Sequence, residues 1–185
     1  DVGSFWATSP LAYKRLVRAL LVFTLFNSSD VFLLLKVKES GLSDIAVIAV
    51  YVLYNLVYAA SSYPIGVLAD KLGMRNVFGM GLVLFASTYI GMAFAVSTWQ
   101  FVALFVLYGL YAASTEGVAK AWISNEVQKG VTATAIGTYT AFQSIATMLA
   151  SALAGVLWYE YGAAATFITS GSIALCVAGY LRWKG

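Results

Sequence analysis

The chain has 185 residues, of which 61% are hydrophobic and only 10% are charged, and its mean hydropathy is +0.84. Soluble domains are about 45–50% apolar and about 25% charged, so this composition excludes an ordinary water-soluble fold and predicts an integral membrane protein. The chain has no histidine and one cysteine, Cys176, which excludes an intrachain disulfide, His-ligated metal sites and Ser–His or Cys–His catalysis.

Six apolar runs follow one another along the chain, and each is close to the length of about 20 residues that a helix needs to cross the hydrocarbon core. They lie at 17–35, 45–64, 77–96, 100–121, 133–157 and 163–181. The segments between them carry charges, Gly or Pro. We therefore predict an all-α integral membrane fold, with residues 1–16 as a cytoplasmic segment and 17–183 as a six-helix transmembrane bundle. The first run contains Asp30 and lacks a small-residue cleavage pattern, so it is not interpreted as a signal peptide.

The tryptophans and the basic residues indicate how the spans cross the membrane. All five tryptophans lie outside the spans or at their ends, where amphipathic rings favour the headgroup region. They are Trp6, Trp99, Trp122, Trp158 and Trp183. Most basic residues fall on one side of this topology: Lys14, Arg15, Arg18, Lys71, Arg75, Lys120, Lys129, Arg182 and Lys184. Only Lys36 and Lys38 fall on the other. Both termini are therefore predicted to be cytoplasmic, and the basic pI of about 9.0 needs no nucleic-acid partner.

Polar side chains follow one face of four predicted helices, at spacings of three and four residues. In chain order they are Thr24, Asn27 and Ser28; Tyr51, Tyr54, Asn55 and Tyr58; Tyr108, Tyr111 and Thr115; and Thr140, Gln143, Ser144, Thr147 and Ser151. The third and sixth helices are plainer. This order predicts two three-helix repeats, in which four helices line a polar space and two support them. The alternative is that these groups only form hydrogen bonds between helices, which contribute about 0.6 kcal/mol each.

Asp30 lies well inside the first predicted span, about twelve residues beyond Arg18. A carboxylate near the bilayer centre costs about 2.5–3.5 kcal/mol on insertion scales, and such residues usually face a water-filled cavity, an ion path or a paired base. Burial disfavours the charged form of a carboxylate, which suits proton coupling. In the alternative interpretation, Asp30 lies near the outer interface within reach of Lys36 or Lys38.

The segment between the second and third spans carries a family pattern. Residues 66–76 read Gly-Val-Leu-Ala-Asp-Lys-Leu-Gly-Met-Arg-Asn. This resembles the signature loop of the major facilitator superfamily, G-x-L-a-D-[RK]-x-G-[RK]-[RK], which lies between helices two and three and again between helices eight and nine. The matching residues are Gly66, Leu68, Asp70, Lys71, Gly73 and Arg75. Met74 departs from the pattern, because a basic residue is usual there.

Glu116 and Lys120 form an i, i+4 pair of opposite charge at the predicted cytoplasmic end of the fourth helix. In the family that the chain resembles, an acidic residue on this helix joins the signature loop in a cytoplasmic charge cluster. The resemblance therefore implies a gate cluster, which we define as Asp70, Lys71, Arg75, Glu116 and Lys120. Ordinary anchoring of charges at the interface is the alternative.

The resemblance covers about residues 14–183 and implies the carboxy-terminal half of a bacterial-type member, with residues 11–18 as the basic linker between halves. Such a half consists of two inverted three-helix repeats, and two halves pack about a central cavity. Its first and fourth helices line the cavity, the second and fifth flank it and contact the other half, and the third and sixth face lipid. The implied partners are the lipid bilayer of the plasma (inner) membrane and an amino-terminal half or a second copy.

These features predict half of a secondary active transporter, not an enzyme, that moves a small organic solute by alternating access with proton coupling at Asp30. Tyrosine, Asn and Gln side chains on the predicted cavity faces favour a neutral or amphipathic solute, and the span centres carry no basic residue for an anion. No cofactor or metal is expected. A small channel and a non-transporting scaffold or receptor with the same fold are the alternatives, while the absence of histidine and of clustered carboxylates disfavours a membrane-embedded enzyme.

Overall fold

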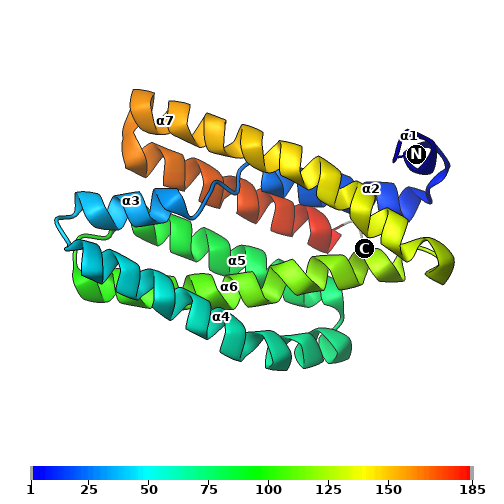
Figure 1. The fold of residues 1–185 in the computed structure, drawn as a ribbon, viewed down its shortest axis with the longest axis horizontal. Helices are drawn as coiled ribbons and strands as arrows, with labels where there is room; N and C mark the ends of the chain where they lie inside the picture. Colours follow the sequence, from blue (N-terminus) through cyan, green and yellow to red (C-terminus); the bar gives the residue numbers. More distant parts are fainter. Residues whose placement is uncertain (1, 184–185) are drawn as a thin grey trace.

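A computed structural model describes residues 2–183, which form an all-helical fold (Figure 1). Its helices are α1 Val2–Thr8, α2 Leu11–Thr24, α3 Val31–Glu39, α4 Asp44–Leu72, α5 Met74–Phe94, α6 Thr98–Asn125 and α7 Thr132–Trp183, with a short 3-10 turn at Lys129–Val131 before α7. Four helical segments, α4, α5, α6 and α7 with its preceding turn, are long and apolar enough to cross a membrane. Residues 1–16, which the sequence predicts as a cytoplasmic segment, contain α1 and the start of α2. Lys184 lies outside the described residues.

Helix α7 consists of two helices that meet at Gly162, where φ is 84° and ψ is 170°. Glycine adopts this positive φ readily because it has no Cβ atom. The chain doubles back at this point, so that the yellow-to-orange arm and the orange-to-red arm of α7 run antiparallel (Figure 1). The sequence predicts a break over 158–162, and the structure confines the non-helical backbone to Gly162.

The first predicted span, 17–35, is not one helix in the structure. Helix α2 ends at Thr24, α3 begins at Val31, and residues 25–30 between them are not helical. The break coincides with Asn27-Ser-Ser-Asp30, whose short polar side chains compete with the backbone for hydrogen bonds. Ser29 Oγ accepts a 3.4 Å hydrogen bond from the backbone N–H of Val31 at the start of α3. Thus a sequence that was expected to give a polar stripe on one helix interrupts the helix instead.

The signature segment forms much less of a loop than the sequence predicts. Helix α4 continues through Pro64 as far as Leu72, and Gly73 alone separates it from α5. Gly73 has a φ of 88°, which lets the chain reverse within one residue. Gly66 lies inside α4, and a Cβ atom there would meet nothing within 4 Å. Of the two signature glycines, Gly73 is therefore the one whose conformation makes the turn.

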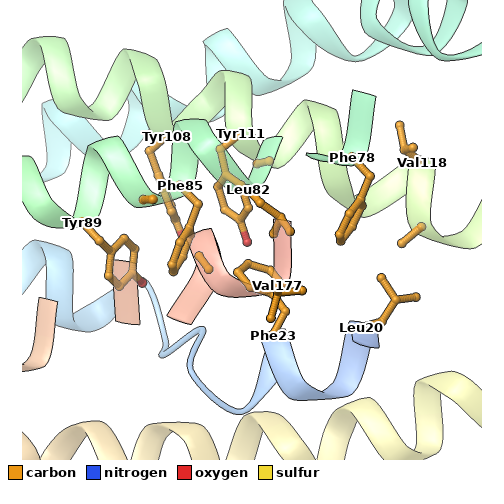
Figure 2. Packing of buried hydrophobic residues seen from close by; sticks show 14 of the residues in the cluster. Leu20, Phe23, Phe78, Leu82, Phe85, Tyr89, Tyr108, Tyr111, Val118 and Val177 are labelled. Atoms are coloured by element: carbon orange, nitrogen blue, oxygen red, sulfur yellow. The ribbon is translucent and has the colours of Figure 1, made fainter. Parts of the chain in front are cut away.

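The core lies where α5 packs against α6 and the second arm of α7, with α2 closing it (Figure 2). The ring of Phe85 on α5 meets the rings of Phe23 and Tyr111 edge to face, each at a centroid distance of 5.0 Å. Glycine lets α4 approach α6, because a Cβ atom at Gly109 would lie 2.8 Å from the carbonyl oxygen of Tyr54. This close contact fixes the tyrosine face of α4 against that of α6.

Helix α4 is the least covered of the apolar helices. Only 11% of its most apolar 18-residue window is buried within the chain, against 56% for α5 and for α6. The first arm of α7 likewise exposes a row of large apolar side chains: Ile145, Met148, Leu149, Leu153 and Val156. These two faces therefore need lipid or another protein surface to cover them.

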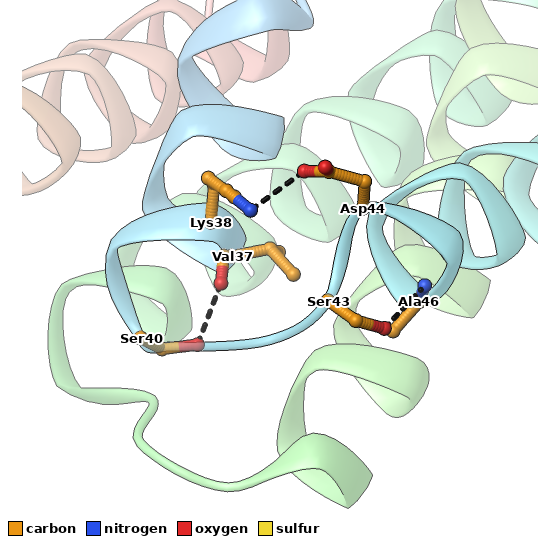
Figure 3. Close-up of polar contacts among 6 residues, drawn as sticks. All are labelled: Val37, Lys38, Ser40, Ser43, Asp44 and Ala46. Atoms are coloured by element: carbon orange, nitrogen blue, oxygen red, sulfur yellow. Dashed lines mark hydrogen bonds and ion pairs between the residues drawn. The ribbon is translucent and has the colours of Figure 1, made fainter.

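The two ends of the bundle differ in charge. The end at which α2 begins and α4 and α6 finish carries most of the basic residues that the structure describes: Lys14, Arg15, Arg18, Lys71, Arg75, Lys120, Lys129 and Arg182. At the opposite end, the Lys38 ammonium lies 2.6 Å from an Asp44 carboxylate oxygen, and Ser43 caps α4 by accepting a hydrogen bond from the N–H of Ala46 (Figure 3). This Lys38–Asp44 ion pair is the one that residues 2–183 contain.

Candidate functional site

A cavity of about 420 Å³ opens between the break in α2–α3, α4, α6 and the first arm of α7. Its lining comprises Thr24, Asn27, Ser28, Ser29, Asp30, Val31, Leu34, Tyr51, Tyr54, Tyr108, Tyr111, Ala112, Glu116, Gln143 and Thr147. None of these residues belongs to α5 or to the second arm of α7. The cavity is thus lined by the four helices that the polar stripes single out, within the part of the chain that the structure describes.

Asp30 is held at this cavity by a tyrosine from another helix. The Tyr108 hydroxyl on α6 donates a 2.5 Å hydrogen bond to Asp30 Oδ1. Asp30 is half-buried and precedes the first residue of α3, where a helix N-terminus favours a negative charge. Tyr54 on α4 also interacts with this carboxylate. Lys38, the base near the outer interface, pairs with Asp44 instead.

Asn27 bridges the helix break to α6 in the same way. Its Nδ2 donates a 2.8 Å hydrogen bond to the hydroxyl oxygen of Tyr111. Its Oδ1 atom is buried and has no hydrogen-bond partner in the structure. A buried amide oxygen without a donor is costly, so this atom is an acceptor available to a group in the cavity.

Tyrosine rings form a continuous aromatic wall along the cavity. Centroid distances are 5.7 Å between Tyr51 and Tyr54, 5.0 Å between Tyr54 and Tyr108, and 5.2 Å between Tyr108 and Tyr111. Tyr89 on α5 supports this wall from the core, because its ring lies 6.4 Å from that of Tyr108. The wall combines apolar ring faces with hydroxyl groups that already bind Asp30 and Asn27.

Glu116 lies farther from the end of its helix than the sequence suggests, and its side chain is exposed. Helix α6 continues from Glu116 to Asn125, a rise of about 14 Å, so this carboxylate does not mark the end of the helix. Glu116 Oε2 accepts a 2.9 Å hydrogen bond from the hydroxyl of Tyr58, the middle residue of α4. Glu116 therefore belongs to the cavity wall.

A second cavity of about 220 Å³ adjoins the first towards the basic end of the bundle. The two cavities share five lining residues: Thr24, Asn27, Tyr111, Glu116 and Gln143. The second cavity adds Lys120, Phe78 of α5 and Tyr139 of α7. Together the two cavities form a polar path from the helix break towards the basic end.

Five residues of the predicted stripes do not line either cavity: Asn55, Tyr58, Thr140, Ser144 and Ser151. Asn55 donates its side-chain hydrogen bond to the backbone oxygen of Tyr51 on its own helix. Tyr58 contributes only through its bond to Glu116. Thr140 is exposed on the first arm of α7. Conversely, spacing alone missed Ser29 and Tyr139; Tyr139 lies four residues before Gln143, which is the signal that could have found it.

The remaining gate residues carry charges that are exposed or half-exposed. Asp70, Lys71 and Lys120 are exposed and Arg75 is half-exposed. No ion pair joins any of these four residues or Glu116 to another charged group within residues 2–183. Glu116 and Lys120, expected as an i, i+4 pair, share the lining of the second cavity without forming a salt bridge.

Comparisons with known proteins place this arrangement in a family. Residues 16–184 match the family model described as Major Facilitator Superfamily. The chain is also similar to an uncharacterized MFS-type transporter of Methanocaldococcus jannaschii, with 32% identity over 178 residues. That match covers 93% of this chain but 44% of the relative, so the chain spans less than half the length of the curated relative it matches. The match to the family model over nearly the whole chain, together with this relative, shows that the chain belongs to the Major Facilitator Superfamily.

Proposed function

We propose that the chain is the carboxy-terminal six-helix half of a secondary active transporter, which moves a small organic solute by alternating access and couples it to protons at Asp30. The observation that carries this proposal is the hydrogen bond from Tyr108 to Asp30 at a helix break that lines a cavity. In membrane transporters, solute and ion sites form where helices are interrupted and the irregular backbone faces a cavity.

Six membrane crossings follow if α2 and α3 together make one broken crossing and the two arms of α7 make two. Helices α4, α5 and α6 supply the others. An even number of crossings places both termini on one side of the membrane. The basic end of the bundle is then cytoplasmic by the positive-inside rule, which agrees with a plasma (inner) membrane protein whose termini both lie in the cytoplasm.

The incompletely covered faces of α4 and of the first arm of α7 support a second half. Both flank the cavity, and both expose large apolar side chains, such as Leu56 on α4 and Met148 on α7. An amino-terminal half of the same protein, or a second copy of the chain, would cover these faces and close the cavity between two bundles. The plainer faces of α5 and of the second arm of α7 would meet lipid.

The gate proposal is narrower than the sequence suggested. Asp70, Lys71 and Arg75 lie at the basic end, where α4 turns into α5, and they have no ion-pair partner among the described residues. Free charges at this end suit contacts with the second half that break when the cytoplasmic side opens. Glu116 serves the cavity, and Lys120 lies between the cavity and the cytoplasmic end.

The test is the accessibility of the cavity from each side of the membrane. In the full-length transporter that contains this chain, Cys176 and every cysteine outside the chain would be replaced by Ser, and Thr147→Cys would supply a single new cysteine. An impermeant maleimide would be applied to vesicles of either orientation under opposite proton gradients. We expect labelling from one side to rise as labelling from the other falls. The control Tyr159→Cys, at the outer turn where Tyr159 is 87% exposed, should react from the outside only.

Two results would contradict the proposal. Simultaneous labelling of Thr147→Cys from both sides would indicate a channel. Labelling that ignores the proton gradient would indicate a scaffold or receptor that has kept the fold.

A further inference from the structure

The cavity of about 420 Å³ at the helix break, called the main cavity below, is lined by charged groups of one sign only. Asp30 and Glu116 are the charged residues in its lining, and no Lys or Arg belongs to it within the described residues. We propose that the solute of this transporter is an organic cation with an aromatic or apolar body. This inference rests on the proposed transport function and narrows the neutral or amphipathic solute that the sequence favours to a positively charged one.

Both carboxylates accept a hydrogen bond from a tyrosine of another segment. Tyr108 donates its hydroxyl to Asp30, and Tyr58 donates its hydroxyl to Glu116, over 2.5 and 2.9 Å. Hydrogen bonds to an ionised acceptor are short and strong, and they hold the carboxylate oxygen in place. The cavity therefore holds two anchored negative groups at different depths, about 12 Å apart along α6 as judged from Tyr108 to Glu116.

The aromatic wall suits the body of such a solute. Tyr51, Tyr54, Tyr108 and Tyr111 follow one another at centroid distances of 5.0 to 5.7 Å. Ring faces attract cations, with a gain that rises when the site excludes water. They also pack against apolar groups, so one wall accommodates both the charge and the body.

Asn27 supplies a further hydrogen-bond acceptor for a positively charged solute. Its Oδ1 atom is buried and has no partner, and Asn27 lines both cavities. A carbonyl oxygen is an acceptor, so an ammonium N–H or the positive side of a solute dipole is the complement that it lacks. An anionic solute would meet two carboxylates and this oxygen with no compensating base.

Lys120 sets the cytoplasmic limit of the region that favours a cation. It lines the second cavity together with Glu116, so the positive charge lies on the cytoplasmic side of the site. The region between Asp30 and Glu116 is therefore the most negative part of the path, and its volume of about 420 Å³ falls within the range of small-molecule pockets.

The test compares two probes of the same shape, benzyltrimethylammonium and its uncharged carbon isostere neopentylbenzene, binding to the full-length transporter in nanodiscs. We expect the cation to bind at least tenfold more tightly. Asp30→Asn and Glu116→Gln should each weaken binding of the cation about tenfold and change binding of the isostere less than twofold. The isostere thus reports whether each variant is still folded. Lys120→Gln should strengthen binding of the cation, because it removes the positive charge beside Glu116.

Equal binding of the two probes, or binding of the cation that ignores all three substitutions, would overturn the inference. The accessibility of Thr147→Cys is measured separately. Alternating accessibility without cation preference refutes the inference alone, whereas cation preference without alternating accessibility refutes the transport proposal.

Discussion

Tyr108 and Asp30, 78 residues apart in the chain, are joined by a 2.5 Å hydrogen bond from the tyrosine hydroxyl to Oδ1 of the carboxylate. This bond ties α6 to the non-helical segment between α2 and α3, at the wall of the main cavity. A rearrangement of the break relative to α6 must break it. The Tyr108–Asp30 bond therefore connects the Asp30 carboxylate to the position of the helix break relative to α6.

Replacing Tyr108 by Phe keeps the ring and removes only the hydroxyl. A hydrogen bond to a charged group contributes about 1.5–3 kcal/mol, so we expect kcat/KM for uptake to fall between about tenfold and about a hundredfold. Uptake into proteoliposomes is the measurement, and Tyr159→Phe, which removes an exposed hydroxyl at the outer turn, is the matched control. Wild-type uptake by Tyr108→Phe would show that the bond has no functional role.

Tyr58 and Glu116 should act as a unit. We expect Tyr58→Phe and Glu116→Gln each to impair uptake, and the double variant to be no worse than the poorer single one, because Tyr58→Phe removes the donor of the 2.9 Å hydrogen bond and Glu116→Gln removes the charge of its acceptor. Coupling energies for residues in contact are about 0.5–3 kcal/mol, which a double-mutant cycle on kcat/KM resolves. Effects that simply add would mean that Glu116 acts without its tyrosine.

Reversing the charge of Asp70 tests the gate. Asp70→Lys should slow uptake several-fold while the ratio of kcat/KM values for two solutes stays constant, because Asp70 lies outside both cavities. Asp44→Lys makes the same change at the opposite end and loses only the exposed pair with Lys38, so we expect nearly normal uptake. A change in solute selectivity in Asp70→Lys would count against a gate role.

Close packing of α4 on α6 predicts a stability effect at Gly109. A Cβ atom there would lie 2.8 Å from the Tyr54 carbonyl oxygen and from Val57, so Gly109→Ala should destabilise the fold by about 1–3 kcal/mol through overpacking. Gly79→Ala on α5 meets nothing within 4 Å and should leave stability unchanged or slightly raised. Thermal unfolding in detergent, followed by tryptophan fluorescence, separates the two. An equal Tm for both variants would refute the close contact.

The sequence predicts most of the cavity because helical periodicity decides which side chains share a face. Asn27, Tyr54, Tyr108 and Gln143 come from four segments, yet the structure brings them to one cavity. The family pattern likewise depends on local sequence alone, and the family model matches the chain from residue 16 onward.

Two features could not be read from the sequence because they depend on contacts between helices. The segment from Asn27 to Asp30 has a composition that fits either a polar stripe on a helix or a break in one. In the structure it is a break, and its side chains bond to Tyr111 and Tyr108 of α6. The place of Glu116 opposite the middle of α4 is shown only by its bond to Tyr58. Hydropathy ends the fourth span near 121, whereas α6 reaches Asn125.

Solute-driven proton flux tests the central claim most directly. The full-length transporter would be reconstituted in proteoliposomes with a pH-sensitive dye inside, with Asp30 intact or as Asp30→Asn, and challenged with a panel of small organic solutes that includes benzyltrimethylammonium. We predict proton movement that follows solute addition in the wild type and disappears in Asp30→Asn. Coupled proton movement of unchanged size in Asp30→Asn would contradict proton coupling at Asp30.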